Sequence, residues 1–438
     1  MAAPAFDGSI QQIAACLRRR DITPLDLVEH CLARIERYDA TIRAWVVVDA
    51  DRARSEAEQL GKELREGEDR GPLHGIPFGV KDIIDVAGFP TRAGSVLTSA
   101  TPATADAPVV ARLRAAGAIV LGKTVTCEWA CFDPSPTRNP WNHDRTPGGS
   151  SSGSAAAVAC GMCVAALGSQ TGGSVTRPAA YCGVVGFKPA HGAISLAGVV
   201  PVSPRLDHVG IFARNVDDAS IVLSVCMSGG DRYTKSHDED SVANQRFRIA
   251  RPAQYFLACA APEVAETVER AMEKLAPVAS IESFELPASF SNVHAMHRRI
   301  MAHDAAVFHA GRYAGAPGEF GPNVAALIEE GLSIGEASYQ AAIAHQEQFT
   351  TEMATIADRF DALLTPATPT VAPVLETTGD PRFNSPWSYC GLPTIGVPAG
   401  IHAGLPIGLQ LVGQHATRLA AIGRELEARV RFTLKPVT

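Results

Sequence analysis

The chain has 438 residues, of which 46% are apolar and 19% are charged, and this is typical of a globular protein with a sizeable core. Its net charge of −7 argues against a nucleic-acid partner, which would need a basic face. The longest run of small apolar residues, 155–168, is too short to cross a bilayer, so we expect no membrane span.

The N-terminus and the cysteines favour a cytoplasmic location. The first residues, MAAPAFDGS, lack the basic region and long apolar run of a signal peptide. Ten cysteines in a chain this long do not suggest a disulfide framework. Cys160 and Cys163 form one CxxC, but no second pair or nearby histidine completes a zinc site. We therefore expect reduced packing cysteines, no metal and no cofactor.

Helices and strands alternate through the first part of the chain. Thr23 followed by Pro24 is typical of a helix N-terminus, and apolar residues then recur at helical spacing. The later patterns predict a strand at 44–48, a charged helix at 51–66, an apolar strand-like segment at 72–85, a helix at 106–116 and a strand at 118–122. This alternation predicts an α/β fold with a sheet layered between helices.

The remaining chain continues the pattern. We expect a helix at 154–159, a strand at 164–167, a helix capped by Asp217 that reaches Met227, a polar surface loop at 229–245, a strand at 247–250 and an amphipathic helix at 262–275. Residues 292–361 look almost entirely helical. Short buried strands at 361–366, 394–398 and 405–412 precede a helix at 418–431. No linker divides the chain, so we expect one domain over residues 1–438.

Two glycine-rich turns with serines flank an uncharged segment in the middle of the chain. The first turn is GGSSSG at 148–153, and the second is TGGS at 171–174. Glycines let a backbone bend tightly and approach another group closely. The pattern predicts a rigid support for hydroxyl chemistry and indicates a serine-dependent amide hydrolase.

A serine hydroxyl is a weak nucleophile until a base takes its proton. Lys81 is the first candidate base, because it lies in an apolar strand where burial would lower the pKa of its amine. The alternative is a lysine on the solvent side of that strand, with Asp82 as a surface partner. Four histidines are expected on one helix: His294, His297, His303 and His309. No carboxylate completes a metal-binding spacing with them, so we interpret them as part of a packed or solvated helix face.

Successive backbone N–H groups in the second turn can stabilise a developing oxyanion. A plain Gly-Gly turn is the alternative. Residues 149–153 also match the G-x-S-x-G nucleophile elbow, with Ser151 as the nucleophile. That elbow requires a buried strand directly before it, and the preceding residues, RNPWNHDRTP, do not form one. The match therefore looks fortuitous.

Taken together, these segments resemble the amidase signature family. The matching segments are PLHGIPFGVKDIIDV, TRNPWNHDRTPGGSSSGSAAAVA, GSQTGGSVTRPAAYCGVVGFKP, DALLTPATP and GLPIGLQLVG. The resemblance implies a single α/β amidase-signature domain, with a mixed β-sheet of about eleven strands sandwiched between α-helices. Residues 70–225 would be the catalytic signature core, and the helical region at 290–360 would cover the substrate pocket.

The same resemblance implies a Ser-cisSer-Lys triad. Lys81 would be the base, Ser150 the bridging serine after a cis peptide bond, and Ser174 the nucleophile that forms an acyl-enzyme. Arg177 and Gly149 are the expected substrate-binding residues. The N–H groups of the second turn would form the oxyanion hole: Thr171, Gly172, Gly173 and Ser174.

Three positions depart from the commonest family pattern. Ser152 stands where many members have glycine, and Gln170 where many have aspartate. Arg177 lies three residues past the nucleophile rather than two. These variants resemble malonamidase, in which the matching arginine binds the substrate carboxylate. Arg177 would therefore either hold a carboxylate or carbonyl oxygen, or form a structural ion pair beneath the site.

Our leading hypothesis is a free-standing amidase that hydrolyses the C–N bond of small linear amides or related carbamates. One alternative is the A subunit of an aminoacyl-tRNA amidotransferase, which shares the triad and feeds ammonia to partner subunits; Gln170 and Arg177 lean away from it. A non-catalytic binding protein on the amidase fold is the other alternative, and the retained triad residues argue against it. The expected partner is a small-molecule amide, and a homodimer is the assembly we consider.

Overall fold

The computed structural model describes residues 6–227 and 246–433. The polar loop expected at 229–245 lies outside the described residues. All ten cysteines are free thiols, and Cys160 and Cys163 are buried. No described helix combines the length and apolar character needed to cross a membrane.

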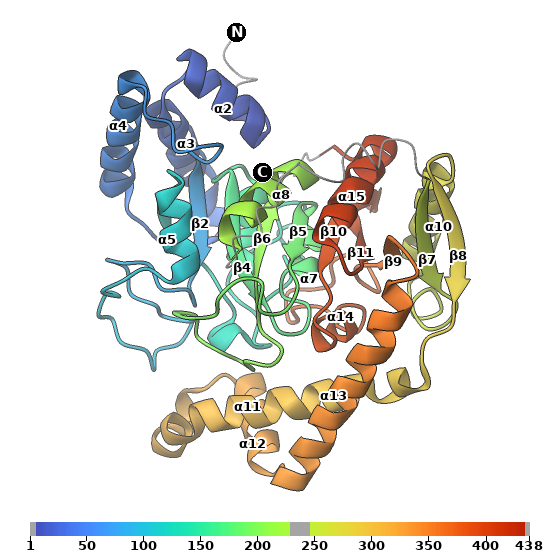
Figure 1. Ribbon diagram of the computed structural model, residues 1–438. Coiled ribbons are helices and arrows are strands. Elements are labelled where there is room, and N and C mark those ends of the chain that lie inside the picture. The colour runs from blue at the N-terminus through green and yellow to red at the C-terminus, as the bar shows by residue number, and fades with distance from the viewer. Residues whose placement is uncertain (1–5, 228–245, 434–438) are drawn as a thin grey trace.

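Eleven strands in the described residues form one mixed sheet that runs through the molecule, in the order β1-β3-β2-β4-β6-β5-β10-β11-β9-β7-β8 (Figure 1). The expected α/β fold is thereby confirmed. The strands are β1 (Trp45–Val48), β2 (Pro77–Lys81), β3 (Ile119–Thr124), β4 (Ala165–Gln170), β5 (Val185–Lys188), β6 (His208–Ala213), β7 (Phe247–Pro252), β8 (Ala279–Phe284), β9 (Ala362–Pro366), β10 (Thr394–His402) and β11 (Leu405–Val412).

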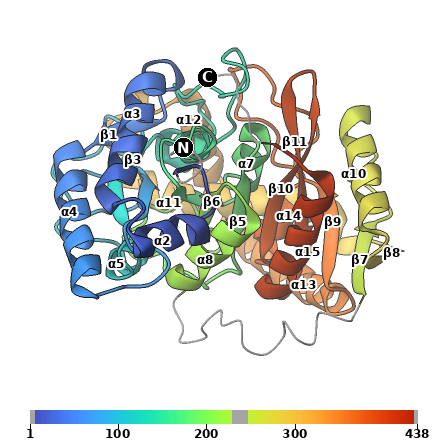
Figure 2. The ribbon, with the colours of Figure 1, turned by 90° about the horizontal axis from the view of Figure 1, so that it is seen from above.

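Helices cover both faces of this sheet, as the view from above shows (Figure 2). Successive residues of a strand point to opposite faces, and Val120 of β3 joins one apolar cluster while its neighbours Ile119 and Leu121 join another. The helices are α2 (Ile10–Arg19), α3 (Pro24–Ile42), α4 (Ala50–Glu66), α5 (Pro108–Ala115), α6 (Ser152–Ala159), α7 (Thr176–Cys182), α8 (Val216–Cys226), α10 (Pro262–Leu275), α11 (Val293–Gly315), α12 (Pro322–Leu332), α13 (Glu336–Ala357), α14 (Ser385–Tyr389) and α15 (Ala416–Val430).

The parallel strands β2 and β4 set the position of the two key segments. Val80 pairs with Leu167, so both strands end at the same edge of the sheet. Lys81 is the last residue of β2, and the second glycine turn begins directly after β4. Segments that are about ninety residues apart in the chain therefore meet at one edge, as parallel pairing requires of their carboxyl ends.

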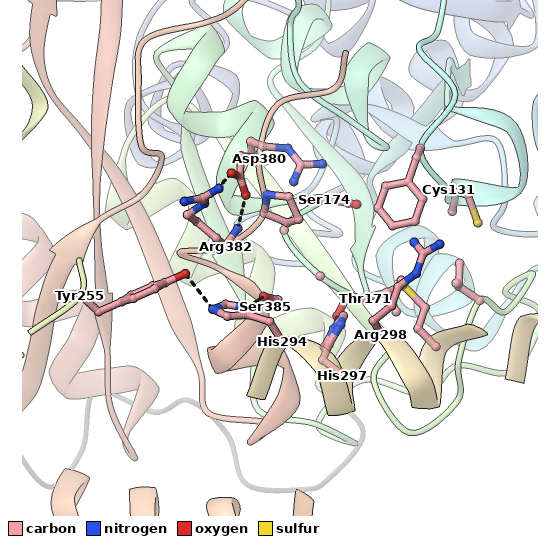
Figure 3. A pocket seen from close by; sticks show the side chains of 18 residues that line it. Cys131, Thr171, Ser174, Tyr255, His294, His297, Arg298, Asp380, Arg382 and Ser385 are labelled. Carbon is pink, nitrogen blue, oxygen red and sulfur yellow. Dashed lines mark hydrogen bonds and ion pairs between the residues drawn. The ribbon is translucent and has the colours of Figure 1, made fainter. Parts of the chain in front are cut away.

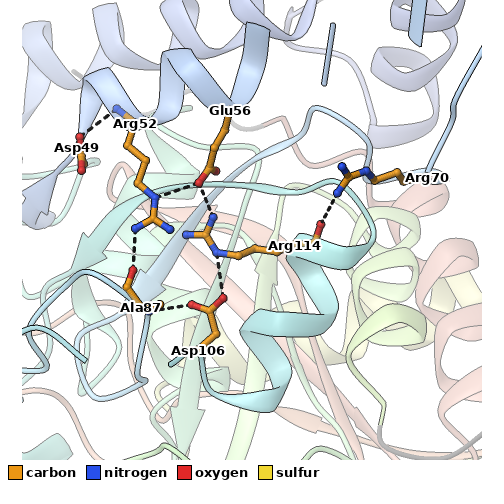
Figure 4. Close-up of polar contacts among 7 residues, drawn as sticks. All are labelled: Asp49, Arg52, Glu56, Arg70, Ala87, Asp106 and Arg114. Carbon is orange, nitrogen blue, oxygen red and sulfur yellow. Dashed lines mark hydrogen bonds and ion pairs between the residues drawn. The ribbon is translucent and has the colours of Figure 1, made fainter. Parts of the chain in front are cut away.

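A network of arginines and carboxylates joins α4 to α5 on the outside of the molecule (Figure 4). The Arg114 guanidinium lies 2.6 Å from Glu56 and 3.2 Å from Asp106. Arg52 donates to the Ala87 carbonyl at 2.7 Å, which ties α4 to the loop that follows β2. These contacts hold the segment that carries Lys81 against its neighbouring helices.

The expected cap of α8 was wrong by two residues. Asn215, not Asp217, is the N-cap: its backbone is extended (φ −148°, ψ 169°) and its side chain accepts from the Asp218 N–H at 2.8 Å. Asparagine is as good an N-cap as aspartate. Asp217 lies in the first turn, where its carboxylate pairs with Arg424 at 3.2 Å.

Candidate active site

Lys81 is fully buried at the end of β2. Its Nζ lies 2.8 Å from the hydroxyl of Ser150 and 2.8 Å from that of Ser169. Burial lowers the pKa of Lys81 to about 7, because the charged ammonium loses its hydration. The alternative of a solvent-facing lysine is therefore wrong, and an amine that is partly neutral near pH 7 stands beside two hydroxyls.

Asp82 is not a surface partner of Lys81, as the alternative had it. It is buried, and its carboxylate lies 2.9 Å from Nζ of Lys123, which is fully buried on β3. Asp82 directly follows the last residue of β2, and its carboxylate pairs with Lys123 rather than with Lys81. Lys81 is thus left without a carboxylate in hydrogen-bond contact among the described residues, and its pKa follows burial.

The first glycine turn presents Ser150 to Lys81. The peptide bond between Gly149 and Ser150 is cis, and the Ser150 carbonyl accepts from the N–H of Cys127 at 3.1 Å. A Cβ on Gly149 would come within 2.7 Å of the Cys127 sulfur, so the turn needs glycine at this position. The expected cis bond at Ser150 is present.

Ser151 does not have the environment of an elbow nucleophile. It is fully buried, its hydroxyl donates to the Ser169 carbonyl at 3.1 Å and accepts from the Ser169 N–H at 3.2 Å. No strand lies directly before it, since β3 ends at Thr124, and this agrees with the sequence-based expectation. Its hydroxyl serves to fix the first turn against β4.

Ser174 lies at the end of the second turn, between β4 and α7, and its side chain makes no hydrogen bond to a described residue. Gln170 holds the start of α7: its Oε1 accepts from the N–H groups of Val175 and Thr176 at 2.9 and 3.0 Å. The glutamine at this position therefore caps the helix that follows Ser174. In the described chain the N–H groups of residues 172–174 donate to no other protein group, which leaves them free for a ligand.

Thr171 fixes the other end of the turn through two contacts. Its hydroxyl donates to Asp207 at 2.5 Å, and its carbonyl accepts from Nε2 of His297 at 3.0 Å. Burial raises the pKa of Asp207 to about 6 and lowers that of His297 to about 4. His297 is therefore neutral at pH 7 and donates its single ring proton to the Thr171 carbonyl.

Arg177 is buried and connects the two glycine turns. Its Nη2 donates to the Gly149 carbonyl at 2.7 Å and to the Thr378 hydroxyl at 3.3 Å. Nε and Nη1 have no hydrogen-bond partner among the described residues. Burial lowers the pKa of Arg177. No ion pair of this arginine is found in the described chain, so it contacts a backbone carbonyl and a threonine hydroxyl rather than a carboxylate.

A cavity of about 430 Å³ opens beside the second turn (Figure 3). Such a volume is in the range of small-molecule sites. Ser174 and Arg177 lie in its wall, whereas Lys81, Ser150 and Gly149 do not. On one side of Ser174 are Cys131 and Arg298, and on the other Tyr255, His294 and Arg382, as the close-up shows. The full lining is Ala130, Cys131, Phe132, Thr171, Gly172, Gly173, Ser174, Arg177, Val202, Tyr255, His294, His297, Arg298, Met301, Asp380, Pro381, Arg382 and Ser385.

Several residues of this region were not found from the sequence. Ser169 contacts Lys81, yet a serine inside a strand carries no signal beyond its place in the quoted GSQTGGS segment. His294 and His297 were placed correctly on one helix, but not in a cavity. No sequence pattern pointed to Asp207, because its contact with Thr171 depends on where β6 lies in the folded sheet.

The chain belongs to the amidase family. The family model named Amidase matches residues 26–417. The resemblance inferred from the glycine turns and the segment around Lys81 is thereby confirmed, and the chain is an enzyme of the amidase family.

Individual relatives span nearly the whole chain. The glutamyl-tRNA(Gln) amidotransferase A subunit of Roseiflexus castenholzii is 35% identical, covering 94% of this chain and 93% of its own length. An amidase known from its crystal structure is 34% identical with a TM-score of 0.89, covering 96% of this chain and 100% of its own. The native peptide amidase from Stenotrophomonas maltophilia is 28% identical with a TM-score of 0.85, covering 99% of each chain.

Proposed function

We propose that this chain cleaves the C–N bond of an amide by attack of Ser174 on the carbonyl carbon. The observation that carries the proposal is the buried Lys81 amine, 2.8 Å from the Ser150 hydroxyl. A base with a pKa of about 7 is well matched to proton transfer near neutral pH. Serine becomes a useful nucleophile only with such a base.

In the proposed reaction the Ser174 proton passes to the oxygen of Ser150, whose own proton passes to neutral Lys81. The Ser174 oxygen then bonds to the carbonyl carbon, and the N–H groups of the second turn stabilise the oxyanion. The relay returns a proton to the leaving nitrogen as the C–N bond breaks. Water, deprotonated by the same relay, releases the acyl group from Ser174. Helix α11 contributes His294, His297, Arg298 and Met301 to the lining of the cavity in which this takes place.

Where the released ammonia goes separates two candidate functions. Curated relatives at 35%, 36% and 34% identity are named as the A subunit of glutamyl-tRNA(Gln) amidotransferase. These relatives support an amidotransferase role, in which ammonia passes to partner subunits, better than they support free-standing hydrolysis of small amides. The amidases of similar fold, at 34% and 28% identity, support the free-standing enzyme. Both candidates use the same proposed attack by Ser174.

The first experiment measures ammonia released by the purified chain from aliphatic, aryl and carboxylate-bearing amides, carbamates and glutamine. We expect release by the wild type and none by Ser174→Ala, with an unchanged circular dichroism spectrum. Ser151→Ala is the matched control, because that buried serine supports the turn without reacting; it should keep measurable activity. Normal turnover by Ser174→Ala would overturn the proposal.

The second experiment separates the two candidates. The same assay is repeated with glutamine after co-expression of the chain with the amidotransferase partner subunits of its source organism, with ATP and charged tRNA added. Glutamine hydrolysis that depends on these additions identifies an amidotransferase component. Efficient hydrolysis of small amides by the chain alone identifies a free-standing amidase.

A further inference from the structure

Three polar side chains from distant segments form a connected row on one side of the cavity. Tyr255 follows β7, His294 lies on α11 and Ser385 begins α14. The Tyr255 hydroxyl is 2.8 Å from Nε2 of His294, and Nδ1 of the same ring is 3.2 Å from the Ser385 hydroxyl. All three line the cavity that holds Ser174 (Figure 3).

Tyr255 is held in an unfavourable backbone conformation to reach this position. Its φ is 70°, in the left-handed region that bulky residues rarely adopt. Such a conformation is unfavourable and persists only where its surroundings enforce it. Three phenylalanine rings meet the tyrosine ring edge-on at 5.0–6.0 Å between centroids, and they fix its direction: Phe256, Phe290 and Phe383.

The three side chains of the row are uncharged at neutral pH. Burial lowers the pKa of His294 and raises that of Tyr255 to about 12, so both remain neutral. Two charged side chains line the same side of the cavity, Asp380 and Arg382, and they pair with each other at 2.5 Å. The row and this ion pair therefore offer no unpaired charge to a ligand, whereas the Arg177 guanidinium in the same cavity lining has no carboxylate partner among the described residues.

A neutral imidazole between two hydroxyls presents one donor and one acceptor to the cavity. One ring nitrogen carries a proton and donates to its hydroxyl, which is then free to donate onward. The other ring nitrogen accepts a proton from its hydroxyl, whose lone pairs stay free to accept. The reverse tautomer exchanges these two roles. Neither hydroxyl has another hydrogen-bond partner among the described residues, so both ends of the row are available to bind a ligand.

We propose that Tyr255, His294 and Ser385 form a specificity-determining subsite for a second, neutral hydrogen-bonding group of the substrate, such as a carboxamide or urea. A carboxamide carries both a carbonyl acceptor and an N–H donor, and it satisfies both ends of the row. An alkyl group would leave both unpaired, and a carboxylate would leave the acceptor end without a donor. The inference rests on the proposed attack by Ser174, because it treats the cavity as the substrate site.

The opposite side of the cavity differs in chemistry. Cys131, Phe132 and Met301 present apolar surface there, with Arg298 paired to Glu330 at 2.8 Å. The neutral polar group of the substrate is therefore directed to the Tyr255 side, and its apolar part to the Cys131 side. This division orients the scissile amide in front of Ser174.

The test uses equilibrium binding to Ser174→Ala, which removes turnover, measured by titration calorimetry. The probes are glutaramide, its carboxylate analogue glutaramate, and 5-methylhexanamide, in which a branched alkyl group replaces the second carboxamide. We expect glutaramide to bind at least about tenfold more tightly than either analogue, since a site built for hydrogen bonding rejects ligands that leave it unpaired. Adding Tyr255→Phe and Ser385→Ala should abolish that preference while leaving 5-methylhexanamide binding within about twofold.

Met301→Leu is the matched control, because it alters the opposite side and should preserve the preference for glutaramide. Equal affinities for the three probes, tighter binding of glutaramate, or a preference that survives Tyr255→Phe with Ser385→Ala would each overturn the subsite. Absence of binding by all three probes would overturn it as well. Failure of the proposed function shows separately, as absence of turnover by the wild type in the ammonia assay.

Discussion

Lys81 combines a fully buried amine with the absence of an ion-pair partner among the described residues. A neutral amine has two N–H donors and one lone pair, and its two hydroxyl partners divide these roles. If Ser150 gives its proton to the lone pair, Ser169 must act as an acceptor. Ser169 is then a positioning residue that turns the lone pair of Lys81 toward Ser150.

The pKa of Lys81 predicts how activity depends on pH. The base must be neutral to accept a proton, so kcat/KM should rise as the pH increases through about 7 and then level off. The check is a profile of kcat/KM between about pH 5 and 9. In Ser169→Ala the ammonium loses a hydrogen-bond acceptor, which lowers the pKa further and moves the rising limb to lower pH. A flat profile in the wild type would show that Lys81 is not the base.

The buried pair of Asp82 and Lys123 predicts a large loss of stability when one partner is removed. Asp82→Asn leaves the Lys123 ammonium buried without its carboxylate, 2.9 Å away in the wild type. Breaking such a pair costs about 3–5 kcal/mol. Urea unfolding should therefore show a lower midpoint for the single variant. The double variant Asp82→Leu with Lys123→Met should recover much of the loss, and an unchanged midpoint in Asp82→Asn would contradict the argument.

At the scale of helices and strands, the parallel pairing of β2 with β4 is what makes the site. The sequence predicted both strands and both glycine turns, because glycine, serine and apolar patterns are local signals. It could not place His294 against Tyr255, 39 residues earlier in the chain, or against Ser385, 91 residues later. Those contacts depend on how α11 and α14 pack at the sheet edge. Asp82 was misjudged for a similar reason, since its partner lies on another strand.

Gln170 gives a prediction about the turn and helix that carry Ser174. Gln170→Ala leaves two N–H groups and the Thr176 hydroxyl without their acceptor. Unsatisfied buried donors cost about 1–3 kcal/mol each, so α7 should loosen and kcat/KM should fall by at least about tenfold. Gln170→Glu is the control: it keeps the acceptor and loses the donor to Ser388. Thermal unfolding and ammonia release measure both effects, and full activity in Gln170→Ala would show that the cap is dispensable.

The whole molecule presents one sheet, three apolar clusters among the described residues and an acidic net charge. Its edge strands β1 and β8 lie at opposite ends of the sheet, and β2 and β4, which carry Lys81 and the second turn, lie nearer to β1 than to β8. Relatives named as amidotransferase subunits match over 94% of the chain, so similarity to them is not confined to the site. A role in an amidotransferase assembly would therefore have to be tested by measuring which partners the surface of this chain binds.

The net charge of −7 predicts that the chain by itself does not hold tRNA. Binding to nucleic acid draws on phosphate contacts by lysine and arginine, and its affinity falls steeply with salt. Fluorescence anisotropy with labelled tRNA should therefore show no saturable binding up to about 10 μM at about 150 mM salt. Lowering the salt concentration should not produce the rise in affinity that is typical of counterion release. If the chain works within an amidotransferase, tRNA affinity should emerge only after partner subunits are added. Micromolar, salt-dependent binding by the chain alone would contradict this and would place a tRNA-contacting face on this molecule.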